Sequence, residues 1–208
     1  MNRPMNLLAH IYLSGSQDRV KIGNFIGDYV KGRKYRRYPP LIKKGILMHR
    51  SIDSYTDHNP VPVEVRSILR PYYRKYAGIV VDLFYDHFLA NDWNHYASCS
   101  LRDFVDRFYK LLEVHFSLLP PAVQNFVPRM IENDRIYSYS NMSGIEKALQ
   151  VMAEYTSLPC KTDKAMQVLS DHYGLIYNNF SKFFPGIISY VAARYDVDLA
   201  YFNLRGHP

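Results

Sequence analysis

Hydrophobic residues recur mainly three and four positions apart along this chain, which is the period of one face of an α-helix. The run IVVDLFYDHFL at residues 79–89 is apolar on almost every side, so it predicts a central, buried helix. Alternation of apolar and polar positions, which is typical of a half-buried strand, is rare. The pattern therefore predicts an all-α protein, a single-domain multi-helix bundle that spans residues 1–208.

Glycines and prolines indicate where the predicted helices begin and end. Gly32 ends the second helix, and the proline pairs at 39–40 and 120–121 suit the first turns of later helices. The pair Pro185-Gly186 predicts a turn or the start of the last helix. The predicted helices are 4–14, 18–31, 40–57, 61–70, 77–91, 100–117, 121–132, 141–157, 162–183 and 185–195.

The composition excludes several classes of protein. With 208 residues, 48% of them hydrophobic, the chain is long and apolar enough for a globular core. Cys99 and Cys160 form no Cys-x-x-Cys pair, which excludes zinc ribbons and thioredoxin-like sites. No apolar run reaches the 18 residues of a membrane span, and the first fifteen residues are too polar for a signal peptide. We therefore expect a cytoplasmic protein without a membrane span.

Positive charge is concentrated near the N-terminus. The net charge is +7, and residues 1–50 alone hold eleven lysines and arginines against two acids. The densest stretch, KGRKYRRY at 31–38, favours either a solvated loop or a docking surface for an acidic partner. The residues predicted to bind that partner are Lys31, Arg33, Lys34, Arg36 and Arg37.

Polar side chains recur four residues apart within the apolar helices, so the members of each set share one helix face. The sets are Asn6 with His10, Asn24 with Asp28, His49 with Asp53 and Asp57, and Asp82 with Asp86, which His87 follows. A buried carboxylate must be paired with a cation or bound to a metal ion. Carboxylates and imidazoles from several helices also form the metal sites of helical bundles.

Some of these side chains also have a structural explanation. His10 is explained equally well as a core histidine bonded to Asn6 or to the backbone. Asp53 has Arg50 three residues before it as an ion-pair partner, and Asn24 suits a helix start. The two acids of the most apolar helix are harder to explain by packing. No Gly-x-Ser-x-Gly elbow, phosphate-binding loop or Glu-x-x-His pair occurs, which disfavours other chemistries.

Four segments of the chain resemble the acyl carrier protein phosphodiesterases, a family also called acyl carrier protein hydrolyases. They are MNLLAH at 5–10, GNFIGDYVKG at 23–32, GILMHRSIDSYTD at 45–57 and VVDLFYDHFLANDW at 80–93, with looser agreement at 143–153 and 171–185. The resemblance implies a fold that resembles a divergent HD-domain, the helical domain of His-Asp metal phosphohydrolases. It implies hydrolysis of the phosphodiester between 4′-phosphopantetheine and a serine of holo-acyl carrier protein, with Mn²⁺ or Mg²⁺ as the cofactor.

This chain departs from the wider superfamily because it contains no His-Asp dipeptide, although Asp-His occurs three times. The superfamily's metal ligands are therefore not transferred to it. The polar sets and the resemblance together predict the metal ligands Asp28, His49, Asp82, Asp86 and His87. The predicted catalytic residues are Arg50, Asp53 and Asn24. Arg50 has the fork geometry that binds phosphate oxygens, and Asp53 either orients His49 or binds the metal itself.

The predicted partner is acyl carrier protein, which is small and acidic as a class, and not a nucleic acid. Two alternatives stay open at this stage. One is a phosphohydrolase of the same fold that acts on a nucleotide or another small phosphodiester. The other is a helical RNA-binding protein that stacks bases on Tyr35 and Tyr38, which leaves the acids of the most apolar helix unexplained. The oligomeric state is unknown from the sequence.

Overall fold

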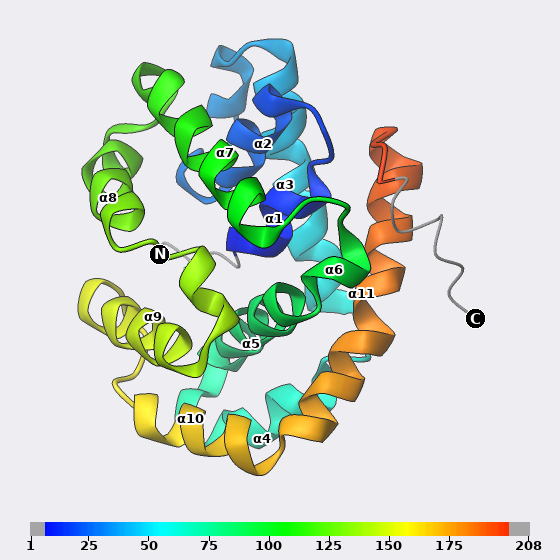
Figure 1. Ribbon diagram of the computed structural model, residues 1–208, viewed down its shortest axis with the longest axis vertical. Helices are drawn as coiled ribbons and strands as arrows, with labels where there is room; N and C mark the ends of the chain where they lie inside the picture. Colours follow the sequence, from blue (N-terminus) through cyan, green and yellow to red (C-terminus); the bar gives the residue numbers. More distant parts are fainter. Residues whose placement is uncertain (1–6, 200–208) are drawn as a thin grey trace.

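The helix at the centre of the fold is α5 (Ala77–Asn91), at the position that its apolar sequence predicts. Around it lie α1 (Leu7–Leu13), α4 (Val63–Tyr73), α9 (Met142–Tyr155) and α11 (Tyr173–Tyr195) (Figure 1). The computed structural model describes residues 7–199, and among these no strand occurs. Their apolar side chains form one core cluster. The all-α prediction is confirmed.

The remaining helices enclose this centre. In Figure 1, α7 (Leu101–Val114) and α8 (Pro121–Glu132) cover the upper left, and α10 (Thr162–Asp171) lies at the lower left. The first half also contains α2 (Asp18–Phe25) and α3 (Pro40–His58), and α6 (Trp93–Tyr96) follows α5. Short 3-10 turns lie at Gly27–Tyr29, Lys34–Arg37, Arg74–Tyr76, Phe116–Leu118 and Tyr137–Ser140. None of the helices within residues 7–199 has the length and hydropathy of a membrane span.

Two glycines allow α2 and α3 to cross at close range. A Cβ atom on Gly23 would lie 2.1 Å from the carbonyl oxygen of Ile42, and one on Gly45 would lie 2.2 Å from that of Val20. Any larger residue at either position would therefore force the two backbones apart. The close crossing brings the polar side chains that follow Gly23 towards those on the inner face of α3.

The predicted helix 18–31 is shorter in the structure. Helix α2 ends at Phe25, and Gly27–Tyr29 forms a 3-10 turn held by hydrogen bonds from the Tyr29 N–H to the Ile26 carbonyl and from the Val30 N–H to the Gly27 carbonyl. Such tight turns are common at helix ends. Asp28 consequently lies on this turn and not on the α2 face that carries Asn24.

The prediction of two helices, 162–183 and 185–195, divided at Pro185-Gly186 was wrong. The chain turns at His172 instead, and α11 continues through Pro185. The lost backbone hydrogen bond is offset because the buried face of α11 packs along α3 and α5. Gly186 serves a close approach and not a turn, since a Cβ there would lie 2.7 Å from the hydroxyl of Tyr55.

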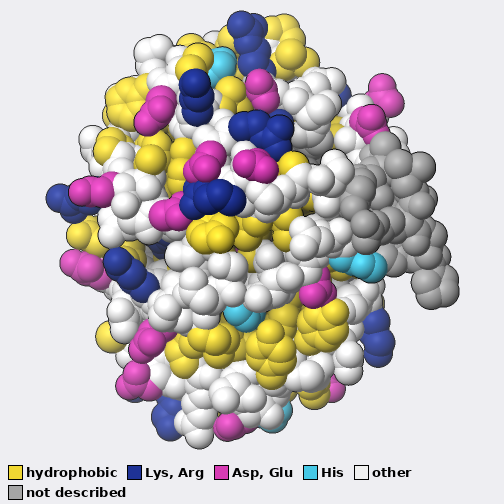
Figure 2. Space-filling view, in the orientation of Figure 1, with side chains coloured by type: hydrophobic (Ala, Val, Ile, Leu, Met, Phe, Trp, Pro, Cys, Tyr) yellow, Lys and Arg dark blue, Asp and Glu magenta, His cyan; other side chains and the backbone are white. Residues whose placement is uncertain are grey.

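The face of the molecule seen in Figure 1 carries acidic and basic side chains close together (Figure 2). Exposed apolar side chains lie between them. This face therefore has no large area of a single charge.

Candidate functional site

Polar side chains from five N-terminal elements converge at one place in the core. They belong to α1, α2, the 3-10 turn Gly27–Tyr29, α3 and α5. We call this group the polar cluster; its members are His10, Asn24, Asp28, His49, Asp53 and Asp82. Five of them were predicted as site residues, and His10 is the addition.

The two histidines of the polar cluster face one carboxylate. The rings of His10 and His49 are stacked with their centroids 4.2 Å apart, and both side chains are buried. The Nε2 atom of His10 lies 3.3 Å from Oδ1 of Asp53, and that of His49 lies 3.4 Å from Oδ2 of the same residue. Oδ1 of Asp28 is 3.5 Å from Nε2 of His49. Each Nε2 atom therefore points into a strongly negative environment.

Asn24 determines which nitrogen of His10 carries the proton. Its Nδ2 group donates to the backbone carbonyl of His10 at 2.8 Å and to Oγ of Ser14 at 2.9 Å. Its Oδ1 atom therefore faces Nδ1 of His10 at 2.7 Å and can only accept, so Nδ1 of a neutral His10 is the donor. The neutral tautomer of His10 then has its lone pair on Nε2, directed at Asp53.

This arrangement requires a positive charge between the rings and Asp53. The Nε2 atoms of His10 and His49 are buried and make no hydrogen bond to any residue in the described part of the chain. A lone pair held 3.3 Å from a carboxylate is repelled unless a proton or a cation lies between them. One ligand atom from each of His10, His49 and Asp53 lies within 4.8 Å of the others. Two imidazoles and a carboxylate suit a divalent transition metal, so the residues fit a metal ion.

The pKa shifts follow from this crowding of acids. Burial by itself lowers the pKa of His49, but the carboxylates of Asp28 and Asp53 close to its ring reverse the effect, so the pKa is raised. Burial raises the pKa of Asp82 to about 7, and the charge of Asp53 adds to the rise, while His10 opposes it. A cation at the cluster would relieve the repulsion between these carboxylates.

Gly27 makes room for the ring of His49. A Cβ atom at this position would lie 2.2 Å from Cγ of His49 and 2.5 Å from its Cβ atom. Only glycine therefore allows the backbone of the 3-10 turn to lie against the imidazole. The same turn carries Asp28 to His49, so the glycine and the acid act together in placing the ring.

Asp86 and His87, both predicted as metal ligands, have hydrogen-bond partners on the backbone. The carboxylate of Asp86 accepts the N–H groups of Leu8 at 3.0 Å and Ala9 at 2.9 Å, at the start of α1. Burial raises the pKa of Asp86 to about 7, against the effect of these two donors. Nδ1 of His87 lies 2.7 Å from the carbonyl oxygen of Tyr139. The structure places neither in the three-residue group, and their role as ligands stays a prediction.

Residues 31–38 form a largely exposed segment that we call the basic loop. The side chain of Arg50 binds this loop and the residue before it. Its guanidinium donates to the carbonyls of Val30 at 2.6 Å and Gly32 at 2.9 Å, and it lies over the ring of Tyr35 at 5.2 Å. These contacts hold the loop against α3. All five of its predicted partner-binding side chains are exposed: Lys31, Arg33, Lys34, Arg36 and Arg37. The predicted phosphate contact of Arg50 stays a prediction.

Two further side chains in or near the polar cluster, those of His10 and Arg66, are not among the residues that the sequence predicts for the site. Spacing from Asn6 was the signal for His10, but Asn6 lies outside the described residues. Arg66 donates to the carbonyls of Thr56 at 2.6 Å and Asp57 at 3.4 Å at the end of α3, and its charge lowers the pKa of Asp82. The sequence pattern gives no signal for Arg66, because its contacts with the end of α3 and its effect on Asp82 of α5 exist only in the folded chain.

Comparison with known proteins identifies relatives along most of the chain. A profile of the family described as "Acyl carrier protein phosphodiesterase" matches residues 5–187, which include the whole polar cluster. An acyl carrier protein phosphodiesterase of Yersinia enterocolitica is 31% identical over 186 residues, covering 89% of this chain and 96% of that protein. One from Enterobacter sp. is 30% identical over 182 residues, covering 87% and 94%. One from Salmonella paratyphi A is 29% identical over 191 residues, covering 91% and 99%. No solved structure matches the chain.

Proposed function

Because the chain belongs to the acyl carrier protein phosphodiesterase family, we propose that it hydrolyses the phosphodiester between 4′-phosphopantetheine and a serine of holo-acyl carrier protein. The products are apo-acyl carrier protein and 4′-phosphopantetheine. The observation that supports a phosphodiesterase is the pair of buried Nε2 atoms facing Asp53. We place the reaction in the cytoplasm, a compartment that keeps unpaired cysteines such as Cys99 and Cys160 reduced.

His10, His49 and Asp53 would hold the divalent metal ion of this reaction, with Asp28 and Asp82 beside them. When bound, such an ion lowers the pKa of water and neutralises charge on a phosphate. Imidazole nitrogens favour Mn²⁺ over Mg²⁺, because Mg²⁺ prefers a shell of oxygen atoms. We therefore favour manganese among the two ions that the family resemblance implies.

The other residues of the polar cluster hold these ligands in place. Asn24 keeps the proton of His10 on Nδ1 and so directs the lone pair of Nε2 towards Asp53. Asp28 faces the ring of His49 and favours the orientation in which Nε2 points inward. The positive charge of Arg66 lowers the pKa of Asp82. We propose that Arg66 offsets part of the negative charge at the edge of the polar cluster.

The test of this function is the intact mass of holo-acyl carrier protein after incubation with the protein and Mn²⁺. We expect loss of the phosphopantetheine mass, prevented by a chelator and restored by added Mn²⁺. His49→Ala serves as the inactive variant. An unchanged mass with protein shown to be loaded with metal would reject the proposed substrate.

The basic loop is the surface that we assign to the acidic carrier protein. Its exposed cations would accelerate the encounter, and salt would screen this effect. We expect a variant with Arg33→Glu, Arg36→Glu and Arg37→Glu to lose about tenfold or more in kcat/KM at low salt, and less at high salt. The matched control reverses three exposed lysines elsewhere: Lys110→Glu, Lys164→Glu and Lys182→Glu. If the loop variant retains full kcat/KM, the carrier protein does not dock on the basic loop.

A further inference from the structure

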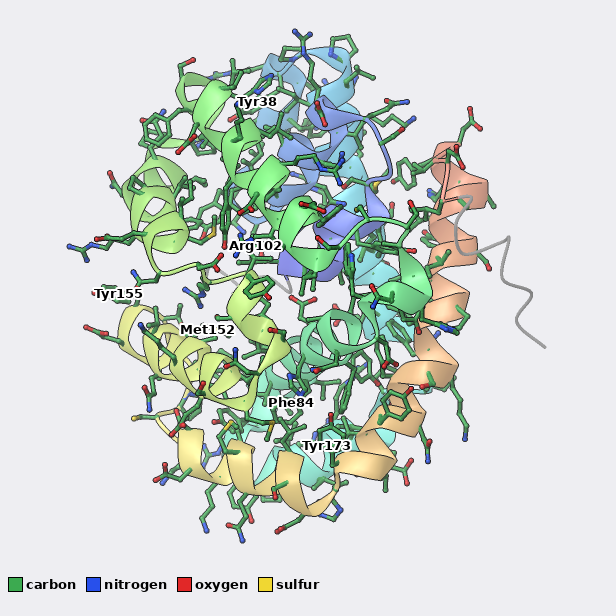
Figure 3. All side chains as sticks on the ribbon, in the orientation of Figure 1. Tyr38, Phe84, Arg102, Met152, Tyr155 and Tyr173 are labelled. Carbon is green, nitrogen blue, oxygen red and sulfur yellow. The ribbon has the colours of Figure 1, made fainter. Side chains whose placement is uncertain are left out.

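A cavity of about 520 Å³ lies between α8 and α9, and none of the polar cluster lines it. Met152 and Tyr155 lie on the edge of α9 that faces α8 (Figure 3). The volume falls in the range of about 300–1,000 Å³ that is typical of pockets for small organic ligands. The cavity is thus large enough for a ligand that the proposed phosphodiesterase reaction does not explain.

The walls of the cavity are mainly apolar. Its apolar lining residues are Leu7, Ala122, Phe126, Met130, Ala148, Val151 and Met152. Two of them are methionines, whose unbranched and polarisable side chains adapt to flexible apolar ligands. Apolar walls that are exposed to water favour binding of an apolar ligand, because binding removes apolar surface of both from water.

The charged groups around the cavity are mostly positive. Arg129, Arg135 and Lys147 line it, and Glu154 is the acid among its described lining residues. Guanidinium and ammonium groups beside an apolar wall suit a ligand that combines a carboxylate with an apolar body.

We propose that this cavity binds a single-chain aliphatic carboxylate, that is, a fatty acid. The apolar walls contact the chain, and Arg129, Arg135 and Lys147 donate hydrogen bonds to the carboxylate. The inner wall is connected to the polar cluster, because Tyr29 lines the cavity and follows Asp28 directly in the chain. Binding of a fatty acid is independent of the proposed phosphodiesterase activity. Because the test measures binding and not turnover, a failure of one proposal does not decide the other.

The first experiment is calorimetric titration of the full chain with dodecanoate below its micelle concentration. Ala122 is exposed and lines the cavity, so Ala122→Trp would fill the space without disturbing the core. We expect this variant to bind dodecanoate at least about tenfold more weakly. The matched control is Ala193→Trp at an exposed position of α11, which should bind like the parent protein. Helical circular dichroism and melting temperature verify that both variants are folded.

The second experiment tests the role of the positive charges. We expect Arg129→Gln with Lys147→Gln to weaken dodecanoate binding about tenfold. Lys110→Gln with Lys182→Gln, which changes exposed lysines outside the cavity, should leave it unchanged. Dodecyltrimethylammonium, with the same chain and a positive head group, should not bind. No binding of dodecanoate, equal binding by Ala122→Trp, or equal binding of the cationic detergent would overturn the proposal.

Discussion

Two buried polar regions lie close together in this protein, and they differ in how their atoms are satisfied. In the polar cluster, the Nε2 atoms of His10 and His49 face Asp53 without a hydrogen bond to any described residue. Around Asp86 and His87, the carboxylate and the ring Nδ1 atom bind backbone groups at 2.7–3.0 Å. Burial of polar groups is common to both. The unsatisfied atoms are the reason why we propose the metal site at the polar cluster and not at Asp86 and His87.

The contrast is sharpest between Asp82 and Asp86, one turn apart on α5. Burial raises the pKa of each carboxyl to about 7. After burial, the main influence on Asp82 is the charge of Asp53, whereas the main influences on Asp86 are the N–H groups of Ala9 and Leu8. The same residue type on the same helix thus repels its neighbours at one position and anchors another helix at the other.

The largest effect is expected for His49→Ala, which removes one of the unsatisfied nitrogens. Turnover of holo-acyl carrier protein should fall about a thousandfold, since a metal contributes several kcal/mol to stabilising the transition state. Binding of Mn²⁺, measured by calorimetry, should weaken in parallel while the fold persists. His58→Ala, at the exposed end of the same helix, is the matched control and should stay within about twofold of the parent turnover. Equal Mn²⁺ affinity in both variants would contradict the assignment.

Asp86→Ala should act on stability instead. It leaves the N–H groups of Leu8 and Ala9 without acceptors, so we expect a loss of about 3 kcal/mol in the free energy of unfolding, measured in urea. Mn²⁺ affinity of the folded protein should change by less than about threefold. Asp82→Ala should show the reverse, with weaker metal binding at little cost in stability. If Asp86→Ala abolishes metal binding and leaves stability intact, Asp86 is a ligand as its sequence predicted.

Gly27→Ala tests how the site depends on backbone packing. The new methyl group would meet the ring of His49 at 2.2 Å, so the ring or the 3-10 turn must move. We expect a loss of about 1–3 kcal/mol in stability and a drop of about tenfold in Mn²⁺ affinity. Gly174→Ala is the matched control, because nothing lies within 4 Å of a Cβ there. Equal behaviour of the two variants would show that the ring is not confined.

The smallest effect is expected for His87→Gln. The amide of glutamine can still donate to the carbonyl of Tyr139, so stability should change by about 1 kcal/mol or less. Turnover should remain within about threefold of the parent value, because the bond to Tyr139 is structural. A loss of a hundredfold or more, with unchanged melting temperature, would place His87 in the reaction and remove the distinction between the two regions.

Much of the fold follows from local sequence. The apolar run at 79–89 predicted the central helix, and α5 occupies the predicted residues 77–91. Prolines predicted the starts of α3 and α8, where Pro40 and Pro121 occupy the first helical positions. Pro185 was misleading because the packing of α11 on α3 and α5 outweighs a local helix breaker.

The sequence by itself determined that this chain is helical, that it belongs to its family, and that buried helices carry acids and imidazoles at shared faces. Spacing along one helix shows which side chains point the same way. It does not show what lies opposite them, because that depends on how separate helices pack. Only the tertiary structure decided that His10 joins His49 and Asp53, while Asp86 and His87 find backbone partners. The physical reason is that the partners of a buried polar atom are set by which helices pack against it, and spacing along one helix does not contain that information.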